Sequence, residues 1–233
     1  MSEFILNESR KDNSSPAIPT GDQVLDGVMG GGIRPGEVWI VGISDDTIKH
    51  DWATQTARNM ARAGYGVALN LPDKDAQYIF TLVHSEISGI PVERIRPGFS
   101  DEDYNRLKET LPEVAKLPIY IDDTYPKSIA ELRIKFASLF ADRKVGCAIF
   151  DYLAPLNRNP QARSEDLASS TRDFKKLATS YGVGVISFVQ PELEGARENE
   201  PMLNQLAQPC IENGADLVTI LSEGNLLSAS GIN

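Results

Sequence analysis

Short apolar runs alternate with amphipathic stretches along most of the chain. Six runs, rich in valine, isoleucine and leucine, have the length of buried strands: 38–43, 66–71, 118–122, 146–152, 182–190 and 215–221. Apolar residues recur at helical spacing over 48–63, 74–88, 128–140 and 164–181, and Ser100 is the expected N-cap of one more helix. Strands that alternate with helices in this way predict an α/β fold with a mostly parallel β-sheet covered by helices on both faces.

The rest of the chain adds few special features. The polar, turn-rich segment 1–17 is expected to form an N-terminal arm, and 18–233 a single domain. The two cysteines are too few for a disulfide framework, and Cys147 lies in an apolar run where a buried, inert side chain is expected. No apolar run reaches the length of a membrane span, and no basic segment precedes an apolar one at the N-terminus. These features predict a cytoplasmic protein with no membrane partner.

The charge of the chain changes the expectation for its partners. The formal net charge is −10, from 33 acidic and 23 basic residues. Proteins that bind nucleic acid on their own usually present a basic face, because contacts with phosphate supply most of the sequence-independent affinity. The acidic balance therefore argues against strong, solitary DNA binding, and it suits docking onto a basic protein surface.

Four segments carry a resemblance to a known family. They are "IPTGDQVLDGVMGGGIRPGEVWIVG" at 18–42, "IYIDDTYPKSIAELRIKFASLF" at 119–140, "AIFDYLAPL" at 148–156 and "VISFVQPELEGARENEPMLNQLAQPCIENGADLV" at 185–218. In this order they resemble the RecA-type ATPase domain of the DnaB family of replicative helicases, over nearly the whole length from 18 to 221. The resemblance implies a RecA-like fold and a place in DNA replication.

The phosphate-binding loop of that family has changed here, at 44–50. Lys49 is retained, but Ile48 stands where the family has glycine and His50 where it has threonine. A branched side chain thus replaces a close approach of the backbone, and a magnesium ligand is lost. The loop also carries two aspartates that would repel a triphosphate. The resemblance implies a vestigial nucleotide site made of Thr47, Lys49, His50 and Asp151.

Two further catalytic parts of the family lack a counterpart. Pro72 stands where the family has its catalytic glutamate, and the carboxylate of Asp73 is displaced from that position by one residue. The arginine finger and partner lysine, which the family carries on a hairpin after the last strand, have no match beyond Leu221. We therefore expect no cofactor, and ATP with Mg²⁺ only if the site has kept some binding.

Each retained residue has a structural interpretation beside the functional one. Asp151 matches the family's magnesium-holding aspartate, and a residual polar strand end is favoured over that role. Lys49 is compatible with an anion at a helix start, although a solvated helix lysine is favoured. Gln190 matches the family's sensor glutamine, and a relic of the fold is favoured there. His50 and His84 are not expected to form a metal site.

Three arginines are the candidates for DNA contact. Arg158, Arg163 and Arg197 lie in two loops that correspond to the DNA-facing loops of the family. Glutamates outnumber the basic residues around Arg197, so solvated loops are favoured over a DNA-binding surface.

The loss of three catalytic parts favours a non-catalytic function. The sequence predicts a binding or regulatory partner of a replicative helicase, or of another replication protein. One alternative is an ATP-dependent DNA helicase with an unorthodox phosphate loop, another is a weak binder of single-stranded DNA, and a homo-oligomer is a further option. The family-like segment "PMLNQL" at 201–206 is expected to be exposed, and its retention suggests a surface in use.

Overall fold

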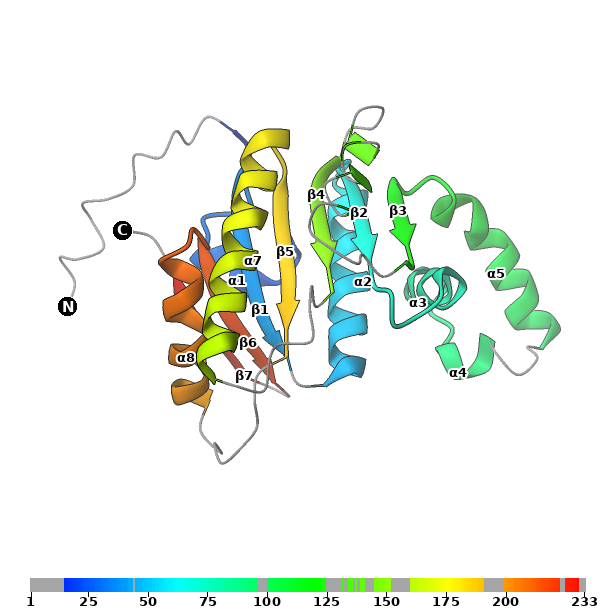
Figure 1. Ribbon diagram of the computed structural model, residues 1–233. Coiled ribbons are helices and arrows are strands. Elements are labelled where there is room, and N and C mark those ends of the chain that lie inside the picture. The colour runs from blue at the N-terminus through cyan, green and yellow to red at the C-terminus, as the bar shows by residue number, and fades with distance from the viewer. Residues whose placement is uncertain are drawn as a thin grey trace.

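A seven-stranded β-sheet with helices on both faces forms the body of the computed structural model (Figure 1). The structure describes residues 15–43, 45–95, 100–124, 145–151, 160–190, 199–222 and 225–230, and some positions within 131–140. The strands are β1 (Val38–Ile43), β2 (Gly66–Asn70), β3 (Ile119–Asp122), β4 (Val145–Phe150), β5 (Gly184–Val189), β6 (Leu217–Ser222) and β7 (Asn225–Ser230). The helices are α1 (Gln23–Val28), α2 (Asp46–Arg62), α3 (Ala76–Ser88), α4 (Val92–Ile95), α5 (Asp101–Val114), α7 (Pro160–Tyr181) and α8 (Asn199–Ile211).

The strand order in the sheet is β3-β2-β4-β5-β1-β6-β7. Strands β1 to β6 pair in parallel, and β7 pairs antiparallel with β6 at one edge. All six predicted strands are present, and their ends lie within two residues of the predicted ones. The predicted fold class, a mostly parallel α/β sheet, is therefore confirmed.

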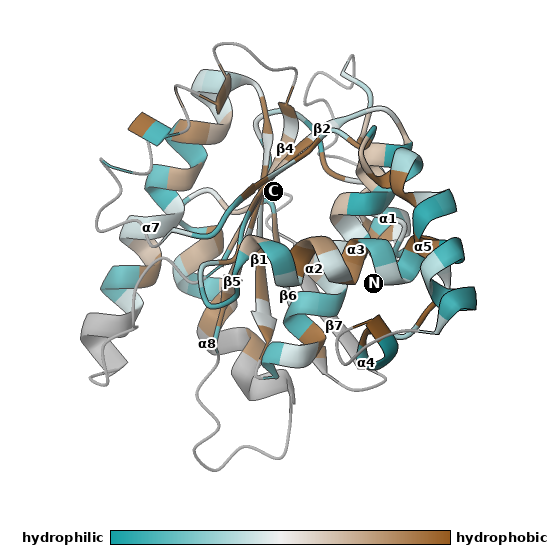
Figure 2. Ribbon diagram, turned by 90° about the vertical axis from the view of Figure 1, so that its right-hand side faces the viewer, coloured by the Kyte–Doolittle hydropathy of each residue, from teal (hydrophilic) through white to brown (hydrophobic). Residues whose placement is uncertain are grey.

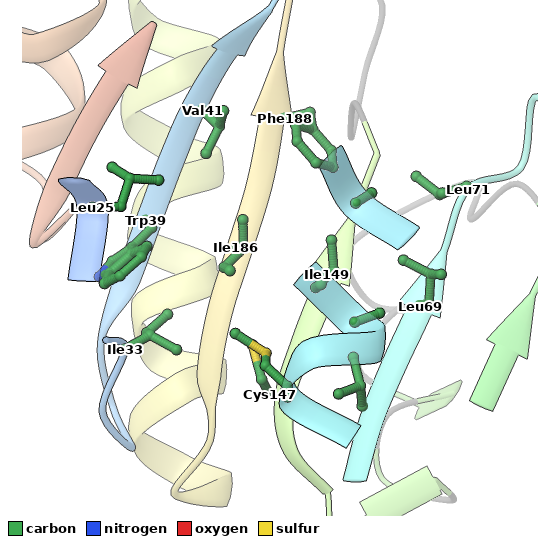
Figure 3. Packing of buried hydrophobic residues seen from close by; sticks show 14 of the residues in the cluster. Leu25, Ile33, Trp39, Val41, Leu69, Leu71, Cys147, Ile149, Ile186 and Phe188 are labelled. Carbon is green, nitrogen blue, oxygen red and sulfur yellow. The ribbon is translucent and has the colours of Figure 1, made fainter. Parts of the chain in front are cut away.

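Alternate residues of strands β1 to β6 contribute to two separate apolar cores. In β1, Val38 and Ile40 belong to the core beneath α7 and α8, whereas Trp39 and Val41 belong to the core beneath α1, α2 and α3. Figure 2 shows the sheet between these two helical layers, and Figure 3 shows the second core around Trp39. Successive side chains of a strand point to opposite faces. A sheet buried on both faces therefore needs the continuous apolar runs seen in the sequence.

Three smaller predictions can be compared with the structure. Ser100 is the N-cap of α5, since its hydroxyl accepts a hydrogen bond from the amide of Asp103 at 3.1 Å. Cys147 is fully buried in β4, and burial raises the pKa of its thiol, so the side chain is inert as predicted. Within the described part of the chain, no helix is both long and apolar enough to span a bilayer.

The C-terminal part departs from the sequence prediction. The segment "PMLNQL" lies within α8, and Leu203 and Leu206 are buried in the core shared with α7. The expectation that this segment is exposed is therefore wrong for both leucines, because they form the apolar side of a helix that covers the sheet. Helices α1, α4 and α8 and strand β7 were not predicted. The predicted arm at 1–17 and the predicted helix at 128–140 lie largely outside the described residues.

Candidate functional site

Four polar side chains gather where β1, β2 and β4 reach their carboxyl ends. Lys49 and His50 lie near the start of α2, which follows β1, while Asp73 follows β2 and Asp151 directly follows β4. Because β2 and β4 are parallel neighbours in the sheet, their two aspartates arrive at the same edge. This is the edge at which open α/β sheets usually bind ligands.

Lys49 lies at the centre of this cluster. Its side chain is 1% exposed, and Nζ lies 2.9 and 3.0 Å from the carboxylate oxygens of Asp151, 3.1 Å from Oδ1 of Asp46 and 3.3 Å from Oδ2 of Asp73. An ammonium group has three N–H donors, and three carboxylates lie within their reach. Burial alone would lower the pKa of Lys49, but the hydrogen bonds and charges of Asp151, Asp46 and Asp73 together outweigh it and raise that pKa, so the lysine stays charged.

One interpretation made from the sequence is wrong. Lys49 is a buried cation and not a solvated helix lysine. Asp151 stands at the polar end of β4, is 5% exposed and meets the ammonium of Lys49 with both carboxylate oxygens. The physical reason is that the first turns of α2 cover the ends of the strands. A charged side chain that is buried there requires an ionic partner.

His50 forms a second polar contact in the cluster. Its Nε2 lies 2.8 Å from Oδ2 and 3.0 Å from Oδ1 of Asp73, and its ring packs edge-on against Tyr78. Burial alone would raise the pKa of Asp73, but the hydrogen bond from His50 and the charge of Lys49 together lower it. The carboxylate of Asp73 is therefore ionised and occupied by two neighbours, so it is poorly placed to act as a general base.

The amides at the start of α2 are also occupied from within the chain. The carboxylate of Asp45 accepts hydrogen bonds from the amides of Thr47, at 2.7 Å, and Ile48, at 3.2 Å. Free amides at a helix start are what binds phosphate in loops of this kind. In this arrangement the amides of Thr47 and Ile48 are capped, Lys49 is paired with carboxylates, and the Thr47 side chain is exposed.

The remaining residues predicted to be functional are only partly described. Gln190 is exposed just after β5, which lies between β4 and β1 in the sheet. Arg158 and Arg197 lie outside the described residues, and of Arg163 only the backbone, in α7, is described. The possible contact of these three arginines with DNA stays a prediction.

The threonine-glycine pair of the first family-like segment has a structural role. The carboxylate of Asp26 accepts hydrogen bonds from the amide and hydroxyl of Thr20, at 2.9 and 2.8 Å, and from the amide of Gly21 at 2.9 Å. Asn59 of α2 donates to the carbonyl of Thr20 at 3.0 Å. Gly21 has a φ of 85°, which favours glycine. The pair therefore anchors the start of the domain to the helix that carries Lys49.

Sequence reasoning missed that Lys49 would be paired within the chain. The three-residue separation of Asp46 and Lys49 is that of a helical ion pair and is a usable signal. Asp73 and Asp151 both follow predicted strands, but only the strand order brings them together. Among the described residues, no group of three or more His, Cys, Asp or Glu side chains is arranged to hold a metal ion.

Comparison with known proteins places the chain in a family. Residues 17–230 match the model of the DnaB-like helicase C terminal domain. The replicative DNA helicase DnaB of Synechocystis is 29% identical over 230 residues, and that of Geobacillus stearothermophilus is 26% identical over 219 residues. These alignments cover 96% and 91% of this chain but only 26% and 48% of the two relatives. The chain thus spans less than half the length of either.

Solved structures agree with this result at the level of the fold. One solved ATPase domain superimposes with a TM-score of 0.75 at 22% identity, covering 91% of this chain and 78% of that one. A DnaB-like replicative helicase, solved in a study of its interactions with primase, gives a TM-score of 0.75 at 21% identity, covering 89% of this chain and 53% of that one. The sheet is therefore RecA-like, and the chain belongs to the family of DnaB-like helicase C-terminal domains.

Proposed function

We propose that this chain is a non-catalytic DnaB-like domain that acts in DNA replication as a binding or regulatory partner of a replicative helicase. The observation that carries the proposal is the ion-pair cluster around Lys49. An ATPase with a phosphate loop needs its lysine available to the β- and γ-phosphates. Here the ammonium is held by Asp46, Asp73 and Asp151.

The cost of releasing Lys49 supports this proposal. Removing one partner from a buried ion pair costs about 3–5 kcal/mol, which corresponds to roughly two to four orders of magnitude in an affinity. A nucleotide would also have to displace the carboxylate of Asp45 from the helix amides and approach the exposed carboxylate of Asp46. Nucleotide binding would therefore be far weaker than in a loop that is open to phosphate.

The groups around the cluster also disfavour hydrolysis. Activation of water needs a base within hydrogen-bond reach of the attacking oxygen. Pro72 cannot supply one, and the carboxylate of Asp73 is engaged by His50 and Lys49. His50 occupies the position of a magnesium-binding hydroxyl, and imidazole is a poor ligand for that hard cation.

The acidic charge and the family together suggest the kind of partner. The relatives are replicative helicases, and one solved neighbour was studied for its interactions with primase. A replicative helicase is the first candidate partner, and another replication protein is the second. Because the net charge is −10, a basic surface on the partner would be complementary, and added salt should weaken the complex.

Co-purification with the replicative helicase from the same source tests the proposal. We expect association at low salt and less association at high salt, while an unrelated protein of similar negative charge should not associate. Absence of association at both salt concentrations, with measurable binding of single-stranded DNA by the chain alone, would favour the DNA-binding alternative. ATP hydrolysis that disappears in Lys49→Ala would instead favour the helicase alternative.

A further inference from the structure

Three carboxylates converge on Lys49 from segments that are far apart in the sequence. Asp46 begins α2, Asp73 follows β2, and Asp151 follows β4. The contact of His50 with Asp73 links α2 to the end of β2 a second time. One ammonium group therefore joins three segments at the carboxyl edge of the sheet.

Without Lys49, the carboxylates of Asp73 and Asp151 would lose the cation that lies between them. Asp151 is 5% exposed and Asp73 25% exposed, so neither carboxylate is fully solvated. Neighbouring carboxylates repel one another by about 1–4 kcal/mol per close pair, and an ionised carboxylate that is buried without a cation is strongly disfavoured. A positive charge is therefore required between them, and the chain supplies it from its own helix.

We infer that Lys49 acts as a tethered counter-cation, whose ammonium fills the position between the three carboxylates and keeps the carboxyl edge of the sheet in one conformation without nucleotide or divalent cation. Lys49 then stabilises the fold and has ceased to be a ligand-binding residue. This inference goes beyond the proposed function, because it does not depend on the identity of any partner.

Replacement of Lys49 by a neutral side chain of similar length tests the inference. Lys49→Met should raise the equilibrium constant for unfolding on the order of a hundred- to a thousandfold, because it removes the buried cation that lies between the carboxylates of Asp151 and Asp73. Lys176→Met is the matched control, since Lys176 also forms an ion pair, 3.1 Å from Asp173, but its side chain is 71% exposed. That control should change the constant by no more than a few-fold. Urea unfolding measures the equilibrium constant for both variants, and an equal change in Lys49→Met and Lys176→Met would overturn the inference.

A second substitution distinguishes the loss of the Lys49 charge from the loss of the packing contacts of its side chain. In Lys49→Met/Asp151→Asn the buried carboxylate that faces Lys49 is neutralised as well, so we expect the double variant to be more stable than Lys49→Met alone. A double variant that is as unstable as the sum of the two single changes would contradict the inference. If Lys49→Met does not fold, Asp151→Asn can be compared with Asp173→Asn, and a rise in the equilibrium constant for unfolding of about tenfold or more should appear only for Asp151→Asn, which removes the carboxylate that meets Lys49 with both oxygens.

The response of the unaltered protein to ligand completes the test. We expect its melting temperature to be unchanged by Mg²⁺, with or without ATP. The ammonium of Lys49 and the carboxylates around it already bind one another, so neither group is open to phosphate or to Mg²⁺. A concentration-dependent rise in melting temperature would overturn the inference. That result would also weaken the non-catalytic part of the proposed function but not partner binding, which co-purification tests, whereas loss of co-purification alone would overturn only the proposed function.

Discussion

The ammonium of Lys49 lies 2.9 Å from Oδ2 of Asp151, although the two residues are 102 positions apart in the sequence. The family resemblance implies that these two positions serve phosphate and magnesium. In this chain each residue neutralises the charge of the other. The same fold that would gather catalytic groups around a nucleotide thus gathers them around one another.

ATP hydrolysis above background is not expected for this protein. Lys49 is engaged by three carboxylates, and the family resemblance implies that Pro72 stands where the family has its catalytic glutamate. A steady-state ATPase assay with and without single-stranded DNA measures this, against a typical enzyme turnover of about 10 per second. DNA-stimulated turnover that Lys49→Ala abolishes would refute the prediction, because a contaminating ATPase would not respond to that change.

Nucleotide affinity should increase when the loop is returned towards the family pattern. We expect Asp45→Ser, Asp46→Asn, Ile48→Gly and His50→Thr, combined in one variant, to bind ATP with Mg²⁺ at least about tenfold more tightly, equivalent to about 1.4 kcal/mol. The changes remove two negative charges, free the helix amides and restore a hydroxyl. The measurement is titration with labelled ATP. The same variant carrying Lys49→Met is the control and should lose the gain. Binding that stays unchanged in the combined variant would mean that the backbone of the loop no longer forms a cradle.

The stability of the protein should be sensitive to one added methyl group at Gly21, which with Thr20 anchors the start of the domain to α2. Gly21→Ala adds a Cβ that would overlap Nδ2 of Asn59, at a φ of 85°. We expect a loss in the free energy of unfolding of about 3 kcal/mol, from backbone strain together with the lost hydrogen bond to Thr20. Gly64→Ala is the matched control, because its φ is 91° but no atom lies within 4 Å of the added Cβ. The control should lose only about 1 kcal/mol, and similar losses for both would disprove the packing argument.

Stability should fall in mild acid because of His84. Burial lowers the pKa of His84, whose Nε2 lies 3.1 Å from the carbonyl oxygen of Leu107 and 2.9 Å from Oγ1 of Thr110. The unfolded chain then binds a proton more readily than the folded one, so stability is lost as the pH falls below about 6.5. We expect His84→Gln to lose less stability than the unaltered protein between about pH 7 and about pH 5.5, because glutamine does not take up a proton. The measurement is urea unfolding at both pH values. If His84→Gln and the unaltered protein lose the same free energy of unfolding, the prediction is refuted.

Much of the fold follows from patterns within the sequence itself. Runs such as "VWIVGI" are apolar throughout because their alternate residues serve two cores, and the N-cap at Ser100 depends on neighbours a few positions away. Patterns of this kind act over one strand or one turn of helix, so a sequence shows them directly. The changed loop at 44–50 was also visible without a structure, because the family pattern there is local.

Only the tertiary structure decided what the polar residues do. Nothing near Lys49 in the sequence, apart from Asp46, indicates its partners, because Asp73 and Asp151 reach it through the strand order of the sheet. The burial of Leu203 and Leu206 likewise depends on where α8 packs. A lysine in water and a lysine between three carboxylates look the same in a sequence but differ greatly in energy, since the cost of burying a charge depends on which groups surround it in space.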